Sequence, residues 1–512
     1  MSISTIFARH AAAIAAMHLT APKTHETSGT ISAVGLTGSF HEWQDGGNER
    51  RDERLGFRTQ RELRVGDTLW IKNASGQIRQ IHGIVAAREI TDNFIDSEAF
   101  VKHPEDAKLL GPATLPDGRA VYRVAISPPH GQPFVVSFDA STWLVDQKSY
   151  VDHDSPQVVT YNDYRVVNGF LVPYTEIDSN GDTRFDVVSK VTSVSVNEPI
   201  AASIFAPLTA AVVDVAAPVI VPMTIQNGLP FVKVTMRGRT YNFLVDSGSQ
   251  GNVIDPRVAT ELGLHPDGPL EVRGAERVSS LGVVETPVMH LGTIALPSRI
   301  ATVLDLSSIL SGSIRLDGVL GYPLFAAAEL RFDPDAKTLT VAKPGALAPL
   351  GSKLDVDTDR ELAEIHAIVD RTAKTTLLVD TGNSNELLLY QSFLDEHKGV
   401  IEYVGSRYVS NRGAGGSTAA LGIFVDSLQL GDQQLYNRYT NIILSSRGAF
   451  ADRNDGGNVG YGTLRNFIAT FDLADRALYL QKAASFDDGR FRPRTEQNTR
   501  VWPPEPFSAG PP

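Results

Sequence analysis

The sequence predicts a mainly β protein, with an N-terminal half-barrel of antiparallel strands and a helix, followed by two pseudo-symmetric β lobes. Two observations carry this prediction. The first is a doubled motif: residues 243–248 and 377–382 each run from apolar residues through Asp and a hydroxyl residue to Gly. The second is the alternation of apolar and polar residues, broken by Asn-Gly turns, across residues 29–207.

A second pair of matching segments follows the first pair. Residues 318–322 (GVLGY) and 458–461 (NVGY) each place apolar residues shortly before Gly and Tyr. Asp246 and Asp380 are 134 residues apart, and Gly321 and Gly460 of the second pair are 139 residues apart. Because two separate motifs recur in the same order at nearly constant spacing, the chain carries a duplicated unit with one Asp in each copy.

Such a duplication suits a two-carboxylate active site. Two neighbouring carboxyls cannot both ionise cheaply, so they share one proton. The ionised group can take a proton from water while the protonated group hydrogen-bonds a substrate carbonyl oxygen. Ser247 and Thr381 can lock the two turns, and Gly248 and Gly382 permit close backbone approach. A single Asp-Ser/Thr-Gly would more often be an ordinary strand-to-turn junction, so the doubling is what favours catalysis.

From about residue 220 to residue 482 the chain resembles the retropepsin-like aspartic proteases of bacteria, here as two tandem lobes forming a pepsin-like bilobal unit. The resemblance implies an aspartic endopeptidase with an intramolecular dyad of Asp246 and Asp380, and it implies no cofactor and no metal. It also implies a group of supporting residues around the dyad: Ser247, Gly248, Thr381, Gly382, Gly321 and Gly460.

Proteases of this family cover their substrate with a hairpin flap, which needs Gly at its tip. Lobe two offers Gly413, Gly415 and Gly416, and lobe one offers Gly274 in a weaker pattern. A plain surface loop explains these stretches equally well. Asn383 stands where the family usually has a small or hydroxyl residue, so the pKa of the lobe-two Asp is expected to depart from the family pattern.

The N-terminal half resembles the periplasmic lipoprotein-carrier family, through loose motifs near Trp70, residues 138–144 and residues 164–173. The resemblance implies a helix laid across a curved antiparallel sheet and a periplasmic or secreted location. We read no convergent charged or metal-binding group in the hollow of that sheet. We therefore expect it to hold an acyl chain, an apolar peptide or its own helix, or to be a closed structural domain. Residues 178–182 (DSNGD) look like a calcium loop, but a tight hairpin explains them better.

Composition excludes several classes of function. The chain has no Cys, which excludes disulfides, thiolate metal sites and a Cys nucleophile. Its net charge of −12 argues against a nucleic-acid partner, and its 12 His residues lack metal-binding spacing. No apolar run approaches the roughly 20 residues of a membrane span. Residues 6–17 predict a short helix that is too short and insufficiently basic for a signal peptide.

We expect a monomer that cleaves an extended polypeptide. The predicted parts are a helix and carrier-like β domain (1–207), a linker (208–222), lobe one (223–345), a second linker (346–353), lobe two (354–485) and an irregular tail (486–512). Two alternatives stay open: a catalytically silent module that binds peptide or lipid, and a dimer in which each lobe pairs with its twin. Near contact of the Asp246 and Asp380 carboxyls would favour the single-chain protease over both.

Overall fold

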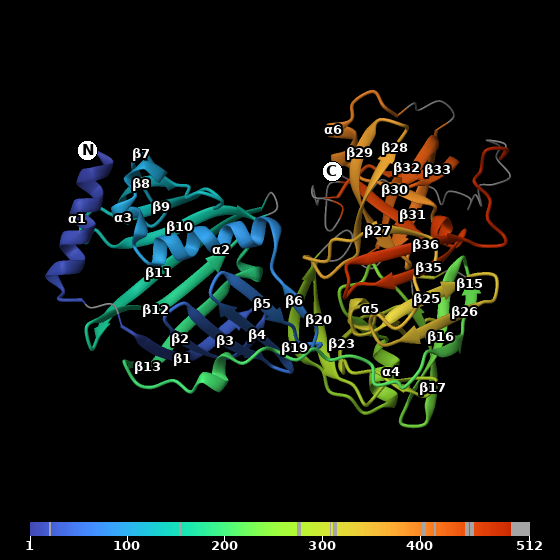
Figure 1. Cartoon of the computed structure of the whole chain (residues 1–512), viewed down its shortest axis with the longest axis horizontal. Coiled ribbons are helices and arrows are strands. Elements are labelled where there is room, and N and C mark those ends of the chain that lie inside the picture. Colours follow the sequence, from blue (N-terminus) through green and yellow to red (C-terminus); the bar gives the residue numbers. More distant parts are fainter. Residues whose placement is uncertain are drawn as a thin grey trace, which may run out of the picture. The chain divides into compact units, whose positions relative to one another are not determined.

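The computed structural model describes residues 1–492 apart from 20–21, 153–154, 274–277, 308, 311–314, 402–405, 414–415, 446–449 and 451–454. The chain is mainly β, as predicted, and divides into two compact units (Figure 1). Unit one holds residues 1–210 with 267–271, and unit two holds residues 211–266 and the chain from residue 272 onward. Within the described ranges, no helix is both long enough and apolar enough to span a membrane.

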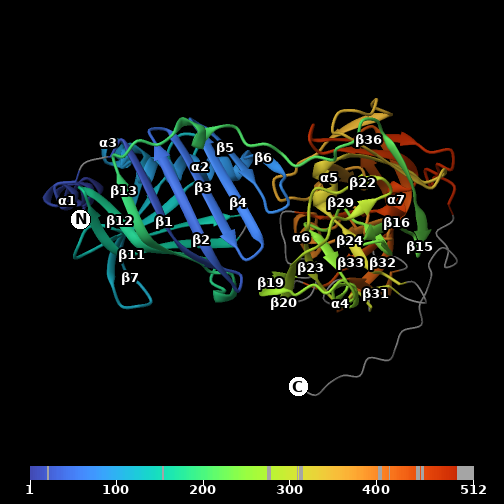
Figure 2. The ribbon, with the colours of Figure 1, turned by 90° about the horizontal axis from the view of Figure 1, so that it is seen from below.

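Unit one contains a single antiparallel sheet in the order β6-β5-β4-β3-β2-β1-β13-β12-β11-β10-β9-β8-β7. Neighbours in the sheet are also consecutive in the chain, except that β1 lies beside β13, so the meanders β1–β6 and β7–β13 join along that pair. Figure 2 shows β13, β1, β2, β3 and β4 side by side. The strands are β1 (Thr24–Ala33), β2 (Leu36–Asp45), β3 (Asn48–Leu55), β4 (Arg58–Val65), β5 (Thr68–Lys72), β6 (Ile78–Gln80), β7 (Ala107–Thr114), β8 (Ala120–Ile126), β9 (Phe134–Asp139), β10 (Val145–Asp152), β11 (Ser155–Val167), β12 (Phe170–Ser179) and β13 (Val187–Val196).

Local chemistry sets the hairpins and helix ends of unit one. Asn168 and Gly169 have φ values of 50° and 81°, and they close the β11–β12 hairpin that the Asn-Gly pair predicts. The N-terminal helix is capped by the Ser2 hydroxyl, which accepts the backbone N–H of Thr5. The helices are α1 (Ile3–Ala16), α2 (Gly83–Asp96) and α3 (Ala99–Lys102), with 3₁₀ turns at Pro104–Asp106, Thr183–Phe185 and Ala202–Phe205.

Helix α2 follows the edge strand β6 in the chain and lies against one face of the sheet (Figure 1). Its Asp92 accepts a hydrogen bond of 2.6 Å from the ammonium of Lys148 on β10. Its Glu89 accepts one of 2.6 Å from the guanidinium of Arg64 on β4. Lys148 is buried. The helix therefore ties strands of both meanders together through ion pairs with little exposure to water.

The expectation that this sheet face lacks convergent charged groups is wrong. The guanidinium of Arg51 donates to Glu42 on the neighbouring strand at 2.8 Å, and Glu62 lies opposite Arg51 in the β3–β4 register. Glu62 is two residues from Arg64, so it shares the face that α2 covers. Burial raises the pKa of Glu176, which lies on this face, to about 7. The strand β3 carries charged residues on both faces, and in β4 Leu63 and Val65 lie on the face opposite to Glu62 and Arg64. The alternation therefore predicts the wrong face of these strands as the one covered by α2.

Two sheets form the bodies of the lobes in unit two. Lobe one has the order β19-β20-β23-β18-β24-β17-β16-β21-β22, with β15 beside β16. Lobe two has the order β28-β29-β34-β30-β33-β32-β31 and closes through a β28–β32 pair. The lobe-one strands are β15 (Thr224–Gln226), β16 (Leu229–Met236), β17 (Arg239–Val245), β18 (Asn252–Ile254), β19 (Asp267–Arg273), β20 (Val278–Glu285), β21 (His290–Leu291), β22 (Ile294–Ala295), β23 (Ile300–Val303) and β24 (Gly318–Leu320). The lobe-two strands are β28 (Glu364–Val369), β29 (Ala373–Asp380), β30 (Leu387–Leu389), β31 (Arg407–Gly413), β32 (Gly416–Leu430), β33 (Gln433–Ile443) and β34 (Gly457–Gly460).

A third sheet joins the two lobes, and each lobe supplies half of it. Its order is β14-β26-β25-β35-β36-β27, with β25 antiparallel to β35 at the centre. One continuous apolar core runs through both lobes, which confirms the predicted bilobal arrangement of two pseudo-symmetric halves. The strands are β14 (Val219–Pro222), β25 (Glu329–Asp333), β26 (Thr338–Ala342), β27 (Ser352–Asp355), β35 (Phe467–Asp472) and β36 (Ala477–Lys482). The helices of unit two are α4 (Pro256–Glu261), α5 (Tyr322–Ala327), α6 (Gln391–Glu396) and α7 (Tyr461–Leu464).

The segments expected to be linkers are partly structural. Residues 208–222 end in β14, which pairs with β26, and residues 346–353 run into β27, which pairs with β36. Val213 is fully buried in the core of unit two, and its N–H donates to the carbonyl of Ala327 at 2.9 Å. Packing of unit two therefore begins before the first of its strands.

Candidate active site

Two equivalent strands deliver Asp246 and Asp380. Asp246 follows β17 and Asp380 ends β29, and each strand lies between an antiparallel neighbour and a parallel neighbour. The residues just before the two carboxylates, Val245 and Val379, are fully buried. A strand that is paired on both edges and packed in the core fixes the backbone from which each carboxyl projects.

The hydroxyls of Ser247 and Thr381 interlock the two Asp loops. The N–H of Ser247 donates to Thr381 Oγ1 at 2.9 Å, and the N–H of Thr381 donates to Ser247 Oγ at 3.0 Å. Each hydroxyl also donates across the lobe boundary, to the carbonyl of Val379 at 2.5 Å and to that of Val245 at 2.8 Å. Both residues are buried, so these four bonds are shielded from water.

Glycine is required in both loops because the opposite carboxyl approaches so closely. The N–H of Gly248 donates to Asp246 Oδ1 at 2.8 Å, and that of Gly382 donates to Asp380 Oδ1 at 2.9 Å. A Cβ on Gly248 would lie 2.6 Å from the Cγ of Asp380, and a Cβ on Gly382 would overlap the Asp246 carboxyl. Each carboxyl therefore lies against the glycine of the other lobe.

Gly321 and Gly460 lie behind the two loops. A Cβ on Gly321 would lie 2.5 Å from the carbonyl oxygen of Ser249, and a Cβ on Gly460 would lie 2.7 Å from that of Asn383. The N–H of the tyrosine that follows each glycine donates to the same loop carbonyl at 2.7 Å in both lobes. The second motif of each copy thus braces the loop that holds the Asp.

The electrostatics of the pair favour a shared proton. Burial raises the pKa of Asp246. Burial also raises the pKa of Asp380 well above its usual range, and the neighbouring charge of Asp246 adds to the effect. The two side chains hydrogen-bond each other, which needs one proton between them. Such a pair can offer an acid and a base at the same time.

The two lobes differ in what else contacts the carboxyls. The side-chain amide of Asn458 donates to Asp380 Oδ2 at 3.1 Å. In lobe one Val319 occupies the equivalent position. It lies on β24, which is paired with β17 and β18, as Asn458 lies on β34, which is paired with β29 and β30. The sequence singled out Asn383 as a departure and missed Asn458. The signal was available, because Asn458 aligns with an apolar residue in the other copy.

The structure describes part of the expected flaps. Gly413 and Gly416 lie opposite each other at the ends of β31 and β32, which form a hairpin. Gly274 and Gly415 lie outside the described residues. In lobe one, β19 and β20 are adjacent in the sheet order and flank residues 274–277. That these two segments cover a substrate stays a prediction.

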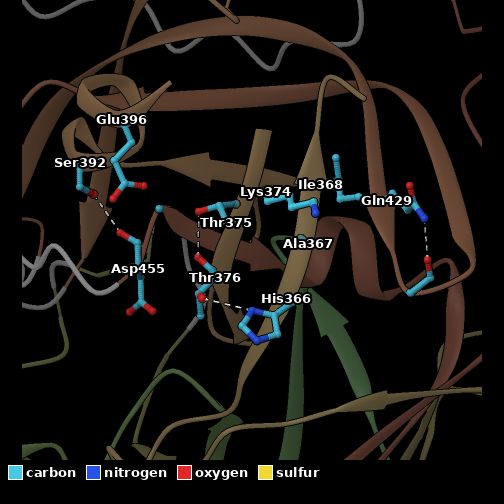
Figure 3. Close-up of a pocket in the computed structure, with 12 residues that line it drawn as sticks. His366, Ala367, Ile368, Lys374, Thr375, Thr376, Ser392, Glu396, Gln429 and Asp455 are labelled. Carbon is cyan, nitrogen blue, oxygen red and sulfur yellow. Dashed lines mark hydrogen bonds between the residues drawn. The ribbon is translucent and has the colours of Figure 1, made fainter. Parts of the chain in front are cut away.

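A cavity of about 550 Å³ lies in lobe two, and no residue of the dyad lines it (Figure 3). Within it the Ser392 hydroxyl donates to the carbonyl of Asp455 at 2.9 Å. A cavity of about 500 Å³ in lobe one is lined by residues of the equivalent hairpin, β16–β17 in place of β28–β29. The two cavities therefore follow from the repeated architecture rather than from the dyad.

One group of side chains lies close enough together to share a metal ion within the described part of the chain. It consists of His103, Glu105 and Asp106, which lie at the surface of unit one. Exposed acidic groups often cluster without binding an ion, so these residues do not define a metal centre. In the segment with the calcium-loop pattern, Asp182 binds the side chain of Arg184 instead, as a tight turn predicts.

Residues 232–324 match the aspartyl protease family, which confirms the resemblance for most of lobe one. No curated protein matches the chain.

Three solved structures are similar to parts of the chain. An aspartic proteinase from Irpex lacteus has 16% identity over 52% of this chain and 98% of its own, with a TM-score of 0.35. A retropepsin-like aspartic protease from Rickettsia conorii has 21% identity over 25% of this chain and 88% of its own, with a TM-score of 0.20. A LolA superfamily protein from Nitrosomonas europaea has 14% identity over 40% of this chain and 98% of its own, with a TM-score of 0.29.

Proposed function

We propose that the chain is an aspartic endopeptidase whose catalytic dyad, Asp246 and Asp380, is completed within one chain. The reciprocal hydrogen bonds of Ser247 and Thr381 support this most directly. They hold two carboxyls in hydrogen-bond contact where burial raises the pKa of both. Placing two acids together in this way destabilises the folded state, so it needs a functional reason.

The reaction needs the dyad with one proton. A water molecule between the carboxyls gives a proton to the ionised Asp and attacks the carbonyl carbon of the scissile peptide bond. The protonated Asp donates to the carbonyl oxygen, so a neutral tetrahedral diol forms. The proton taken from water then passes to the amide nitrogen and the C–N bond breaks. A hydroxyl of the diol gives its proton back to the other Asp, so the dyad returns to its starting charge.

The substrate is an extended polypeptide in this proposal. Hairpins such as β31–β32, tipped by Gly413 and Gly416, suit backbone hydrogen bonding to an extended chain. A periplasmic or secreted location belongs to the same proposal and follows from the resemblance of the N-terminal half to lipoprotein carriers. A monomer suffices, because both carboxyls come from one chain.

A ligand for unit one also remains a proposal. The sequence predicts an acyl chain, an apolar peptide or the domain's own helix in its hollow. Helix α2 covers one sheet face, and its Glu89 and Asp92 bind Arg64 and Lys148 there. These charges favour the helix as the occupant of that face, because an apolar ligand in its place would leave Arg64 and Lys148 without the carboxylates of the helix.

Cleavage of a peptide library by the purified chain tests the proposed activity, with Asp246→Asn and Asp380→Asn as the variants. Each substitution removes either the acid or the base, so each should lower kcat by about 10²–10⁴-fold. Pepstatin, an inhibitor of aspartic proteases, should abolish wild-type cleavage.

The melting temperature of each variant provides the control, because the Asn side chains have the same shape and should leave the fold intact. A folded single variant that kept most of the wild-type turnover would refute the two-Asp mechanism. Activity that rose with the square of protein concentration would instead favour a dyad formed between two chains.

A further inference from the structure

A chain of four asparagine side chains ends on the carboxyl of Asp380. Asn441 donates to Asn385 at 3.0 Å, and Asn385 donates to Asn383 at 2.7 Å. Asn383 then donates to Asn458 at 2.6 Å, and Asn458 donates to Asp380 Oδ2 at 3.1 Å. Asn441 and Asn458 are buried, so both ends of the relay are shielded from competing water, whereas Asn383 and Asn385 are half-buried.

The direction of this relay is fixed by a backbone group. The backbone N–H of Asn385 donates to Asn383 Oδ1 at 2.9 Å, and a backbone N–H can only donate. The other end of the Asn383 amide, its NH₂ group, therefore faces Asn458. Asn458 must accept there with its oxygen, which leaves its own NH₂ group to donate to Asp380.

Both oxygens of Asp380 therefore accept N–H donors, since Oδ1 accepts the N–H of Gly382. The hydroxyl oxygen of a protonated carboxyl is a weak acceptor, so the Asn458 amide favours an unprotonated Oδ2. Burial, the charge of Asp246 and the hydrogen bond with Asp246 raise the pKa of Asp380 and so favour the proton on Asp380. The N–H that Asn458 donates to Oδ2 opposes these effects, because it stabilises the anion. The N–H of Gly382 also lowers the pKa of Asp246. Its hydrogen bond of 2.9 Å, however, is to Asp380 Oδ1.

Lobe one lacks the corresponding donor. Val319, which pairs with Leu244 in the same register as Asn458 with Leu378, carries no polar group. Ser249 stands in the place of Asn383, and its hydroxyl donates within its own loop, to the carbonyl of Gly251 at 2.8 Å.

Charged groups beside the relay pair with one another, and Asp487 also binds Arg492. Glu386 follows Asn385 in the chain, and its carboxylate binds the guanidinium of Arg438 at 3.2 Å and that of Arg492 at 2.5 Å. The neighbouring charge that acts on Asp380 is that of Asp246.

We propose that Asn458, oriented by Asn383 and Asn385, is a positioning residue that keeps Asp380 as the base of the dyad and so leaves the proton on Asp246. This inference rests on the proposed protease activity and assigns the two roles within it. The residue touches Asp380 rather than the substrate, so its effect is on which carboxyl ionises first.

The test is the pH dependence of kcat/KM for Asn458→Val, which places the lobe-one residue in lobe two. The acid limb reports the first ionisation of the dyad and should move up by about one to two pH units, because the anion loses a charge-assisted hydrogen bond. The alkaline limb should not move, because Asp380 is ionised on both sides of that second step. A shift of the alkaline limb, alone or together with the acid limb, would overturn the assignment, and so would a shift of neither limb.

Two further variants separate positioning from loss of stability. Asn383→Ser inserts the lobe-one residue, keeps Asn458 and removes its orienting partner, so its acid limb should move in the same direction by a smaller amount. Asn466→Ala is the matched control, because Asn466 is a buried amide of lobe two that donates to the carbonyls of Gly462 and Thr463. It should lower the melting temperature and leave both limbs in place.

A second measurement does not depend on catalysis. The free energy of urea unfolding of wild type and of Asn458→Val is compared between pH 3 and pH 8. The bond of the amide to the anion exists only when Asp380 is ionised, so the difference should grow as pH rises through the first ionisation of the dyad. Below that ionisation it should fall to the constant cost of the lost Asn383 bond. A difference that stays constant with pH overturns the inference. An inert wild type with a pH-dependent difference would refute the protease proposal alone.

Discussion

At the scale of single residues, the side chains of Ser247 and Thr381 connect the two Asp loops. Each hydroxyl accepts one N–H and donates to one carbonyl across the lobe boundary. Elsewhere in the Asp246 loop the Ser249 hydroxyl donates within the loop, to Gly251, and the Gln250 side chain donates at the surface to the carbonyl of Arg360 at 2.7 Å. Movement of one carboxyl relative to the other is therefore resisted mainly by two buried side chains.

Ser247→Ala and Thr381→Ala should each lower the free energy of unfolding by about 1–3 kcal/mol, because each leaves a buried N–H without its acceptor. The double variant should cost clearly less than the sum, since the two residues bond to each other. Urea unfolding measures all three values. Ser249→Ala is the control and should change little, and strictly additive losses would contradict the interlocked arrangement.

Many residues of the candidate site can be predicted from the sequence alone. The repeated Asp-hydroxyl-Gly motif identified Asp246 and Asp380, and the structure brings their side chains into hydrogen-bond contact. It could not identify the contact of Asn458 with Asp380, because a side chain on the bracing strand reaches its neighbour only once the strands have packed. Asn383 is unusual in the sequence, but its hydrogen bond to Asn458 follows only from the fold, which places the two side chains together.

At the scale of elements, β3 and β4 show why a strand pattern can mislead. Their charged residues repeat every second position, so one face of each strand carries Glu49, Arg51, Glu62 and Arg64. The apolar residues of β4, Leu63 and Val65, lie on the opposite face, so the apolar pattern does not mark the face that α2 covers. The doubled lobes were easier to predict, since their apolar runs are buried on both faces.

The buried acids should make unit one less stable as pH rises. Burial raises the pKa of Glu49 and of Glu176 from 4.5 to about 7. These groups hold more protons in the folded state than in the unfolded state, so stability is greatest below about pH 4.5 and falls as pH rises toward 7.

Glu176→Gln isolates this effect, because the amide cannot ionise. By scanning calorimetry, the variant should melt higher than wild type at pH 7.5 and close to it at pH 4.5. The exposed Glu198→Gln serves as the comparison and should show no such dependence. Equal melting of wild type and Glu176→Gln at pH 7.5 would contradict the burial of a charge there.

At the scale of the whole molecule, unit two contains everything that the proposed reaction needs. Its core begins with Val213 and extends to Phe486, whose ring lies 5.4 Å from that of Phe467. Arg492 then binds Glu386 of lobe two. The folding unit is therefore longer at both ends than residues 220–482, the span of the sequence resemblance.

A fragment of residues 211–492 should fold as a monomer and keep most of the wild-type kcat/KM on short peptides. Residues 220–482 should melt lower, because the buried Val213 and the packing of Phe486 are lost. Light scattering and peptide hydrolysis measure both. Loss of short-peptide cleavage by a folded, monomeric 211–492 fragment would show that unit one completes the site.

The six-stranded sheet, with three strands from each lobe, joins both halves of the site in one polypeptide and so affects how the site can evolve. Two identical chains that meet on an axis must carry the same side chain on both sides of it. Copies joined in one polypeptide can acquire substitutions independently, as Val319 and Asn458 illustrate. Covalent fusion thus allows the two halves to specialise, each carboxyl adapting to one task without altering its counterpart.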